Sequence, residues 1–188
     1  MESKSASQLA YVGSKPTNET RTGDRDAWFT PAKYLEAART TFGGHIDLDP
    51  FSDAVANRLV QAGRIFTLEN SALTQDWDSP ETKKPTVWMN PPYGKACKDA
   101  VAKFLNEFLA GHFTEGIVLT NNATETKWFQ MLLGKASAIC LTDHRIGFYN
   151  IDGKRVSNNT RGQCFFYFGD GREAFRNAFS GFGSVITL

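Results

Sequence analysis

The sequence predicts an α/β fold in which a mostly parallel sheet carries helices on both faces. Short apolar segments of strand length alternate with longer segments of helical periodicity, and such alternation is typical of a mostly parallel sheet. The chain has 188 residues, enough for one domain with a substantial hydrophobic core. It contains 41% apolar and 22% charged residues, as ordinary globular proteins do.

The first third of the chain is expected to hold a tail, two helices and two strands. Residues 1–22 are polar and aperiodic, so we expect a flexible tail ahead of a single domain over residues 23–188. Thr30 and Pro31 predict the N-cap and first position of a helix that ends at Gly43. The elements expected next are a strand over residues 45–49, a helix over 53–61 and a strand over 64–68.

The rest of the chain continues the alternation. An apolar stripe at helical spacing begins at Cys97 and closes at Gly111, and Thr124 is expected to cap another helix. The remaining predicted elements are strands over residues 86–89, 116–120, 137–141 and 164–168 and a helix over 173–179. Because ligands of such sheets bind beyond the carboxyl ends of the strands, a site is expected within residues 47–51, 67–70, 90–94 and 120–123.

The most informative segment is the Asn-Pro-Pro-Tyr-Gly corner that directly follows an apolar strand. Asn90 and Pro91 each precede a proline, which disfavours helical backbone angles, and neither Pro91 nor Pro92 has an N–H. If the side-chain oxygen of Asn90 and the carbonyl of Pro91 face one cleft, they form two fixed acceptors beside the flat ring of Tyr93. Gly94 lets the chain turn away closely.

Two acceptors and a stacking surface suit a planar amine. An exocyclic amine on a heteroaromatic ring is a poor nucleophile, because its lone pair is delocalised into the ring. Two hydrogen bonds from its hydrogens favour a tetrahedral nitrogen and localise that lone pair. The amine can then attack an electrophilic methyl group held in line, without a covalent enzyme intermediate. The alternative interpretation is a turn that only ends a strand.

Six segments carry a resemblance to a known family. They are W-x-T-P (residues 28–31), D-x-D-P (47–50), F-T-x-E followed by D-W (66–77), NPPYG (90–94), TNNATETKWF (120–129) and R-I-x-F (145–148). NPPY fits the pattern [DNS]PP[YFW], so the chain resembles the class I S-adenosylmethionine-dependent amino-methyltransferases. More narrowly, it resembles the phage-encoded DNA N6-adenine methyltransferases, the phage Dam-like family. The resemblance implies a Rossmann-like domain of the seven-strand type with no separate target-recognition domain.

The resemblance implies a role for each matching residue. Asn90, Pro91, Pro92 and Tyr93 would hold and stack the target adenine, which must leave the duplex for its amino group to be reached. S-adenosylmethionine is the implied cofactor, and the residues implied to contact it are Trp28, Phe29, Thr30, Pro31, Asp47, Asp49, Pro50, Glu69 and Asp76. The helix N-terminus at Pro31 suits the cofactor carboxylate. Glu69 would take the ribose hydroxyls and Asp76 the adenine amino group.

Contacts to DNA are expected from a second set of residues. These are Tyr93, Lys95, Asn121, Arg145, Phe148 and Arg161. The basic members would follow phosphates beside the cleft, and an ordinary solvated loop surface is the alternative. Without a separate recognition domain, a short or relaxed target sequence is expected. No metal site is expected, because the three histidines have no ligand partner at metal spacing.

Some of these residues keep alternative interpretations. Asp47 and Asp49 lie two residues apart at the end of a strand, and the alternative for one of them is a simple cap of the following helix. Trp28 belongs either to the core or beside the cofactor sulfonium. The chain also departs from the family pattern, because no glycine-rich first motif follows its first strand and the stretch up to Asn90 is short. This departure bears on the assignments of Glu69 and Asp76 more than on that of Asn90.

The composition bears on the cellular compartment and on the binding partners of the protein. The net charge of +1 neither requires nor excludes nucleic acid. The three cysteines form no CxxC pair, no apolar run has the length of a membrane span, and no apolar signal-peptide core begins the chain, so the cytoplasm of a host bacterium is expected. We expect an adenine-specific DNA methyltransferase that acts on double-stranded DNA as a monomer or weak dimer. The alternatives are an NPPY enzyme acting on an RNA base or a protein glutamine, and an inactive DNA-binding relative.

Overall fold

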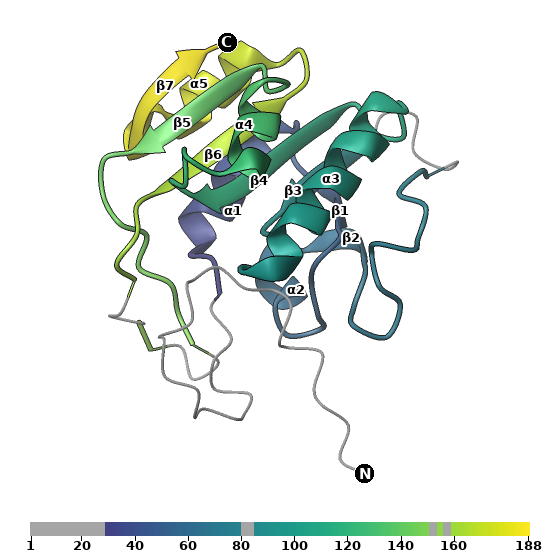
Figure 1. Cartoon of the computed structure of the whole chain (residues 1–188). Helices are drawn as coiled ribbons and strands as arrows, with labels where there is room; N and C mark the ends of the chain where they lie inside the picture. The colour runs from purple at the N-terminus through teal and green to yellow at the C-terminus, as the bar shows by residue number, and fades with distance from the viewer. Residues whose placement is uncertain (1–28, 80–84, 151–153, 156–158) are drawn as a thin grey trace.

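The computed structural model describes residues 29–79, 85–150, 154–155 and 159–188. In these residues seven strands form one sheet with the order β2-β1-β3-β4-β6-β5-β7 (Figure 1). The strands are β1 (Ile46–Asp49), β2 (Ala62–Ile65), β3 (Thr86–Met89), β4 (Glu115–Asn121), β5 (Ala138–Thr142), β6 (Gln163–Phe168) and β7 (Gly183–Thr187). The expected tail over residues 1–22 lies outside the described residues, as does Trp28.

Most strands of the sheet run in one direction. β1 pairs in parallel with β2 and with β3, and β3 pairs in parallel with β4. β6 is antiparallel to both β4 and β5, so β5 has the direction of β4, while β7 is antiparallel to β5. The predicted mostly parallel sheet is therefore confirmed. The carboxyl ends of β1, β3 and β4 meet at one edge of the sheet, which we call the carboxyl edge.

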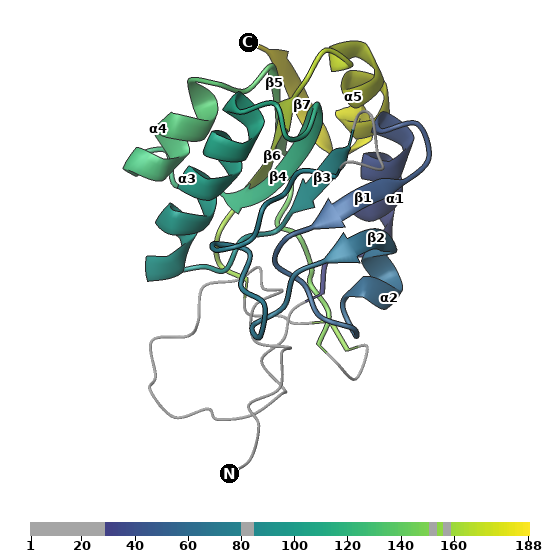
Figure 2. The same ribbon diagram turned by 90° about the vertical axis from the view of Figure 1, so that its right-hand side faces the viewer.

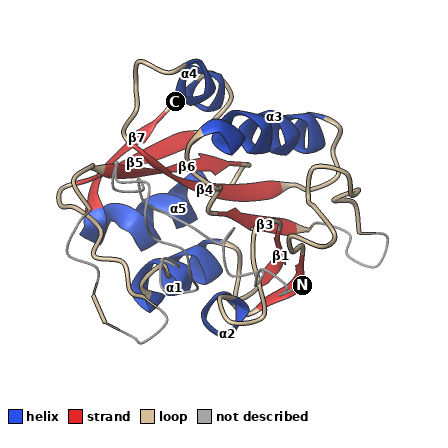
Figure 3. Cartoon of the chain, turned by 60° about the horizontal axis from the view of Figure 1, so that its bottom comes forward, coloured by secondary structure: helices blue, strands red, loops and turns tan. Residues whose placement is uncertain are grey.

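Helices cover both faces of this sheet, as the sequence predicts (Figure 2 and Figure 3). On one face lie α1 (Ala32–Thr41), α2 (Asn57–Val60) and α5 (Arg172–Phe179), and on the other lie α3 (Lys95–Leu109) and α4 (Lys127–Leu133). The alternation of side chains along β3 divides the core between the faces. Trp88 packs in the cluster with α1 and α5, whereas Val87 and Met89 pack in the cluster with α3 and α4.

Two predicted helix caps are wrong. In α1 the N-cap position is Pro31, with no side-chain cap, so Thr30 does not cap this helix. In α4 the N-cap is Thr126, whose Oγ1 accepts a hydrogen bond from Phe129 N at 3.3 Å, and Thr124 is not the cap. The side chain of Thr30 is instead part of the candidate site described below.

The segment from β1 to β2 also differs from prediction. The helix expected over residues 53–61 is reduced to α2, and in the turn ahead of it Asp53 Oδ1 accepts backbone hydrogen bonds from Val55 and Ala56 at 2.7 and 2.8 Å. β2 begins earlier than expected, where the Asn57 side chain bonds both backbone groups of Ala62. It ends before Phe66, whose backbone bonds the loop that follows β1.

The described part of the chain contains no helix with the length and apolarity needed to cross a membrane. Cys97, Cys140 and Cys164 are buried free thiols. Burial is the main cause that raises the pKa of each to about 12. The three thiols are therefore protonated at neutral pH and act as packing groups.

The close packing around Gly116, between β4 and α3, can be tested by substitution. A methyl group added at Gly116 would lie 2.7 Å from Phe104 Cζ and 3.0 Å from a ring carbon of Phe113, and both rings are fully buried. We expect Gly116→Ala to lower the free energy of unfolding by about 1–3 kcal/mol through overpacking. Gly181→Ala is the matched control, because no atom lies within 4 Å of its added methyl group. Urea denaturation measures both, and equal stabilities would mean that the rings yield without cost.

Candidate functional site

A small cavity lies at the carboxyl edge, between β1, β3 and the face that carries α1 and α2. It encloses about 20 Å³, room for about one water molecule. The lining residues are Phe29, Thr30, Leu35, Asp49, Phe51, Ala56, Leu59, Val60, Trp88 and Asn90. We call it the inner cavity. It brings together the start of α1, the end of β1 and the corner after β3, segments that the sequence predicted to carry the site.

Asn90 presents an unpaired acceptor at this cavity. The residue is only 5% exposed, and its Nδ2 donates a hydrogen bond to Thr30 Oγ1 at 3.3 Å. Its Oδ1 is buried and has no hydrogen-bond partner within the described parts of the chain. Because the amide nitrogen is held by Thr30, the amide oxygen is the free end of the group. A buried acceptor without a partner is costly, so this atom suits a ligand that brings a donor.

Carboxyl groups set the electrostatics of the inner cavity. Burial raises the pKa of Asp49 to about 7 and outweighs the opposing hydrogen bond from Phe51 N, while the nearby charge of Asp53 raises the pKa further. Asp53 Oδ2 is itself buried, with no partner in the described residues. No Lys, Arg or His is among the described residues that line the cavity. A cationic ligand group would therefore be favoured here.

Tyr93 has a fixed hydroxyl and a partly accessible ring. Its hydroxyl lies 3.4 Å from Leu119 O, and burial raises its pKa well above the usual range. The ring is partly buried and packs against the core cluster that contains α1. Gly94 follows with a φ of 86°, a conformation that favours glycine, and lets the chain enter α3 directly. The ring, rather than the hydroxyl, is the part of Tyr93 available to a ligand.

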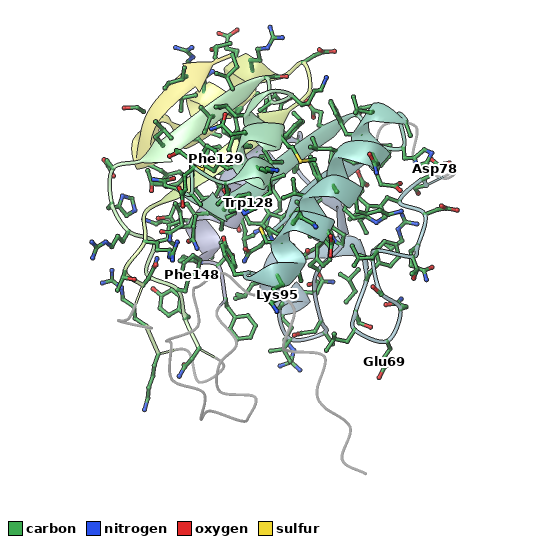
Figure 4. All side chains as sticks on the ribbon, in the orientation of Figure 1. Glu69, Asp78, Lys95, Trp128, Phe129 and Phe148 are labelled. Atoms are coloured by element: carbon green, nitrogen blue, oxygen red, sulfur yellow. The ribbon has the colours of Figure 1, made fainter. Side chains whose placement is uncertain are left out.

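The acidic residues predicted to contact the cofactor do not all lie at the inner cavity. Asp47 faces away from the inner cavity, and its Oδ2 accepts hydrogen bonds from Thr86 N at 2.7 Å and Thr86 Oγ1 at 2.9 Å. Glu69 is exposed in the loop after β2 and projects outward (Figure 4). Asp76 is exposed near His112, whose pKa is raised chiefly by its hydrogen bond with Glu107 and further by the nearby charges of Asp78 and Asp76. His112 follows the far end of α3, away from the corner.

The residues predicted to contact DNA also separate into two groups. Lys95, Arg145 and Arg161 are exposed. Phe148 is fully buried in the core cluster with α1, which leaves its ring no surface for a base. Asn121 is buried, and its Oδ1 accepts a hydrogen bond from Gln163 Nε2 at 3.0 Å. Asn121 and Phe148 therefore hold the structure together around the site.

Gln163 is a residue of this region that the sequence did not point out. Besides Asn121, its Nε2 bonds Asn159 Oδ1 at 3.2 Å and Arg161 O at 2.8 Å, and its Oε1 accepts from Ile146 N at 3.0 Å. The side chain thereby attaches both ends of the loop between β5 and β6 to the end of β4. A glutamine at the start of an apolar strand has no local pattern that would reveal these partners.

A wider groove opens beside the inner cavity and shares Phe29, Thr30 and Leu59 with it. It measures about 880 Å³ and lies between the start of α1, α2 and the loop after β5. Its basic lining residues are Lys33, Arg58, His144, Arg145 and Arg155. We call it the cationic groove. Of these, Arg145 was predicted to contact DNA, whereas Lys33 and Arg58 were not, since they lie on helices whose orientation depends on the packing.

Pro31 and Pro50 complete the set of predicted cofactor residues. Pro31 lines the cationic groove, and Pro50 is buried directly after β1. Phe29 is tied to the loop after β5 by paired backbone hydrogen bonds with Tyr149, at 2.7 and 3.1 Å. This pairing holds the segment before α1 across the opening between the cavity and the groove.

Comparison with known proteins identifies one family. Residues 17–180 match the family model described as DNA N-6-adenine-methyltransferase (Dam). The matched range contains the corner after β3, the inner cavity and the cationic groove. No curated protein matches the chain.

Because the carboxyl of Asp49 is buried, we expect the stability of the folded protein to depend on pH. The pKa of Asp49 is about 7 in the folded protein, against about 3.9 in an unfolded chain, so the folded state binds the extra proton between these values. Its contribution to stability is therefore full below about pH 4 and is lost as the pH rises through 7. We expect the stability of Asp49→Asn relative to wild type to rise between pH 4 and 7 and then level off. Urea denaturation at several pH values measures this difference, and a difference independent of pH would contradict the prediction.

Proposed function

Because the chain belongs to the DNA N-6-adenine-methyltransferase (Dam) family, we propose that it transfers a methyl group from S-adenosylmethionine to the N6 atom of an adenine flipped out of duplex DNA. The observation that carries this proposal is the unpaired Oδ1 of Asn90, held in place by Thr30 at the inner cavity. It offers an acceptor for an amino hydrogen at the carboxyl edge, where ligands of such sheets bind.

The residues around the inner cavity suit parts of the cofactor, and because the cavity has room for only about one water molecule they would border the bound cofactor and not enclose it. When bound, S-adenosylmethionine supplies an electrophilic methyl group on a sulfonium. Asp49 offers a buried carboxyl to the positive charge, and Phe29 and Phe51 supply apolar walls. The N-terminus of α1, which has no side-chain cap, favours the carboxylate end of the ligand. Glu69 is exposed beyond β2 and projects outward, so its contact with the ribose hydroxyls stays a prediction.

Asp47 and Asp76 have no cofactor role in this proposal. The carboxylate of Asp47 is already bonded to Thr86, and Asp76 lies near the far end of α3. Trp28 lies outside the described residues, so its contact with the cofactor stays a prediction.

In the proposed reaction the chain positions and polarises the amine. Asn90 Oδ1 and the Pro91 carbonyl accept the two amino hydrogens, which localises the nitrogen lone pair toward the methyl group. Pro92 keeps the corner rigid, and the ring of Tyr93 stacks on the flipped base. Because the hydroxyl of Tyr93 is buried against Leu119, its part is stacking and not proton transfer. The rate advantage comes from positioning and fixed dipoles.

The direct test uses purified protein, S-adenosylmethionine and unmethylated DNA containing all short sequences. The DNA is digested to nucleosides, and N6-methyladenine is measured by mass spectrometry, with RNA and a protein extract as parallel substrates. We expect N6-methyladenine in DNA alone. Methyl transfer only to RNA or protein would overturn the proposed substrate, and no transfer with no cofactor binding would overturn the proposed activity.

Substitution of Asn90 is the most direct test of the proposed chemistry. Asn90→Ala should lower the transfer rate by at least about 100-fold, because the acceptor for the amine is removed. Asn90→Asp keeps an acceptor oxygen and should retain more activity than the alanine variant. Circular dichroism and calorimetric binding of S-adenosylmethionine should change little in both. An active alanine variant would exclude Asn90 from the chemistry.

The stacking role of Tyr93 is tested separately. Tyr93→Ala should weaken binding of DNA with a flipped adenine by ~1–3 kcal/mol, because the stacking surface is removed. Tyr93→Phe should be mild, since it removes only a long hydrogen bond of 3.4 Å to Leu119 O. Fluorescence anisotropy below the melting temperature of each variant measures the affinities. Equal affinity of wild type and Tyr93→Ala would contradict a stacking role.

A further inference from the structure

The cationic groove carries positive charge that no described carboxylate neutralises. Lys33, Arg58, Arg145 and Arg155 line it, and none of the described lining residues is Asp or Glu. None of the four forms a salt bridge with a described acidic residue. The adjacent carboxylate of Asp143 bonds His144 instead. Four cations in one groove without a described acidic partner favour an anionic ligand.

The groove is held by contacts on each side. Tyr34 Oη and His144 Nε2 are 2.7 Å apart, which joins α1 to the loop after β5. Tyr149 pairs with Phe29 on one side and with Arg155 on the other. A methyl group added at Gly147 would lie 2.1 Å from Arg155 Nε, so the guanidinium rests directly on the glycine backbone. These contacts therefore join the segments that carry the cations to one another.

The charges of the groove and of the inner cavity are opposite. The cavity has the buried carboxyl of Asp49, whereas the groove has only basic charged groups among its described lining residues. The cofactor of the proposed reaction bears a sulfonium and an ammonium group beside one carboxylate, so its net charge is positive and favours the cavity over the groove. A polyanion is favoured in the groove for the same electrostatic reason.

We propose that the cationic groove holds the phosphate backbone of the DNA strand whose adenine is presented to Asn90. The two spaces share Phe29, Thr30 and Leu59, so a strand in the groove has its bases next to Asn90. The DNA backbone then crosses α2 and the loop after β5, where Arg58, Arg145 and Arg155 lie, and does not follow Lys95 and Lys98 on α3. This inference rests on the proposed function for the identity of the polyanion.

The test compares three double variants that each remove two exposed cations. Arg58→Gln with Arg145→Gln alters the groove, Lys95→Gln with Lys98→Gln alters the start of α3, and Lys135→Gln with Arg172→Gln is the matched control away from the carboxyl edge. Binding of a labelled adenine-containing duplex is measured by fluorescence anisotropy at salt concentrations from about 50 to about 200 mM, with no cofactor present. Calorimetry measures the binding of S-adenosylmethionine, and thermal melting confirms folding.

The groove variant should bind the duplex at least about tenfold more weakly, and the slope of log affinity against log salt should fall by roughly 0.9 for each phosphate that the variant no longer neutralises. The control should stay within about twofold of wild type, and cofactor binding should be unchanged in all variants. Unchanged DNA binding in the groove variant would overturn the inference, as would weaker binding confined to the α3 variant. A groove variant that fails to bind the cofactor and still binds DNA would assign the groove to the cofactor.

These outcomes are separate from the proposed reaction. A wild-type protein that binds DNA through the groove but forms no N6-methyladenine would contradict the proposed activity and keep the groove as the DNA site. Methyl transfer by a protein whose DNA binding does not depend on Arg58 and Arg145 would support the proposed activity and contradict the groove as the DNA site.

Discussion

The hydrogen bond from Asn90 Nδ2 to Thr30 Oγ1 is the contact on which the rest of the site depends. It joins two segments that are 60 residues apart in the chain, the corner after β3 and the entry to α1. It orients the amide so that the oxygen is the free atom, and it fixes the wall shared by the inner cavity and the cationic groove. A rigid corner is useful here because an acceptor already in place needs no reorganisation when a ligand arrives.

Opposite charges lie on the two sides of this wall. On the inner side burial keeps the pKa of Asp49 near neutrality, so a bound cation and a proton compete for the same carboxyl. On the outer side Lys33, Arg58, Arg145 and Arg155 remain without acidic partners in the described chain. In the proposed function this separation lets the sulfonium of the cofactor and the phosphates of the DNA bind beside different charged groups.

The antiparallel part of the sheet supports the site from a distance. β6 lies between β4 and β5, and Gln163 at its start bonds Asn121, Asn159 and the backbone of Ile146. These bonds attach the loop after β5 to the carboxyl edge and bring its basic residues beside α1. A buried amide that is satisfied on several sides contributes rigidity as well as stability. Arg145, next to the anchored Ile146, can therefore present its charge to a ligand at a constant position.

The sequence by itself determined the α/β class, the strand over residues 86–89 and the rigid corner at the carboxyl edge. These follow from local periodicity and from the stereochemistry of proline, which act over a few residues. Only the tertiary structure decided that Thr30 holds Asn90 instead of capping α1, that Asp49 and not Asp47 faces the inner cavity, and that Phe148 is buried. It also decided that Arg58 joins the cationic groove. Each of these depends on contacts between distant segments, and such contacts are set by how helices pack on the sheet, which no local pattern records.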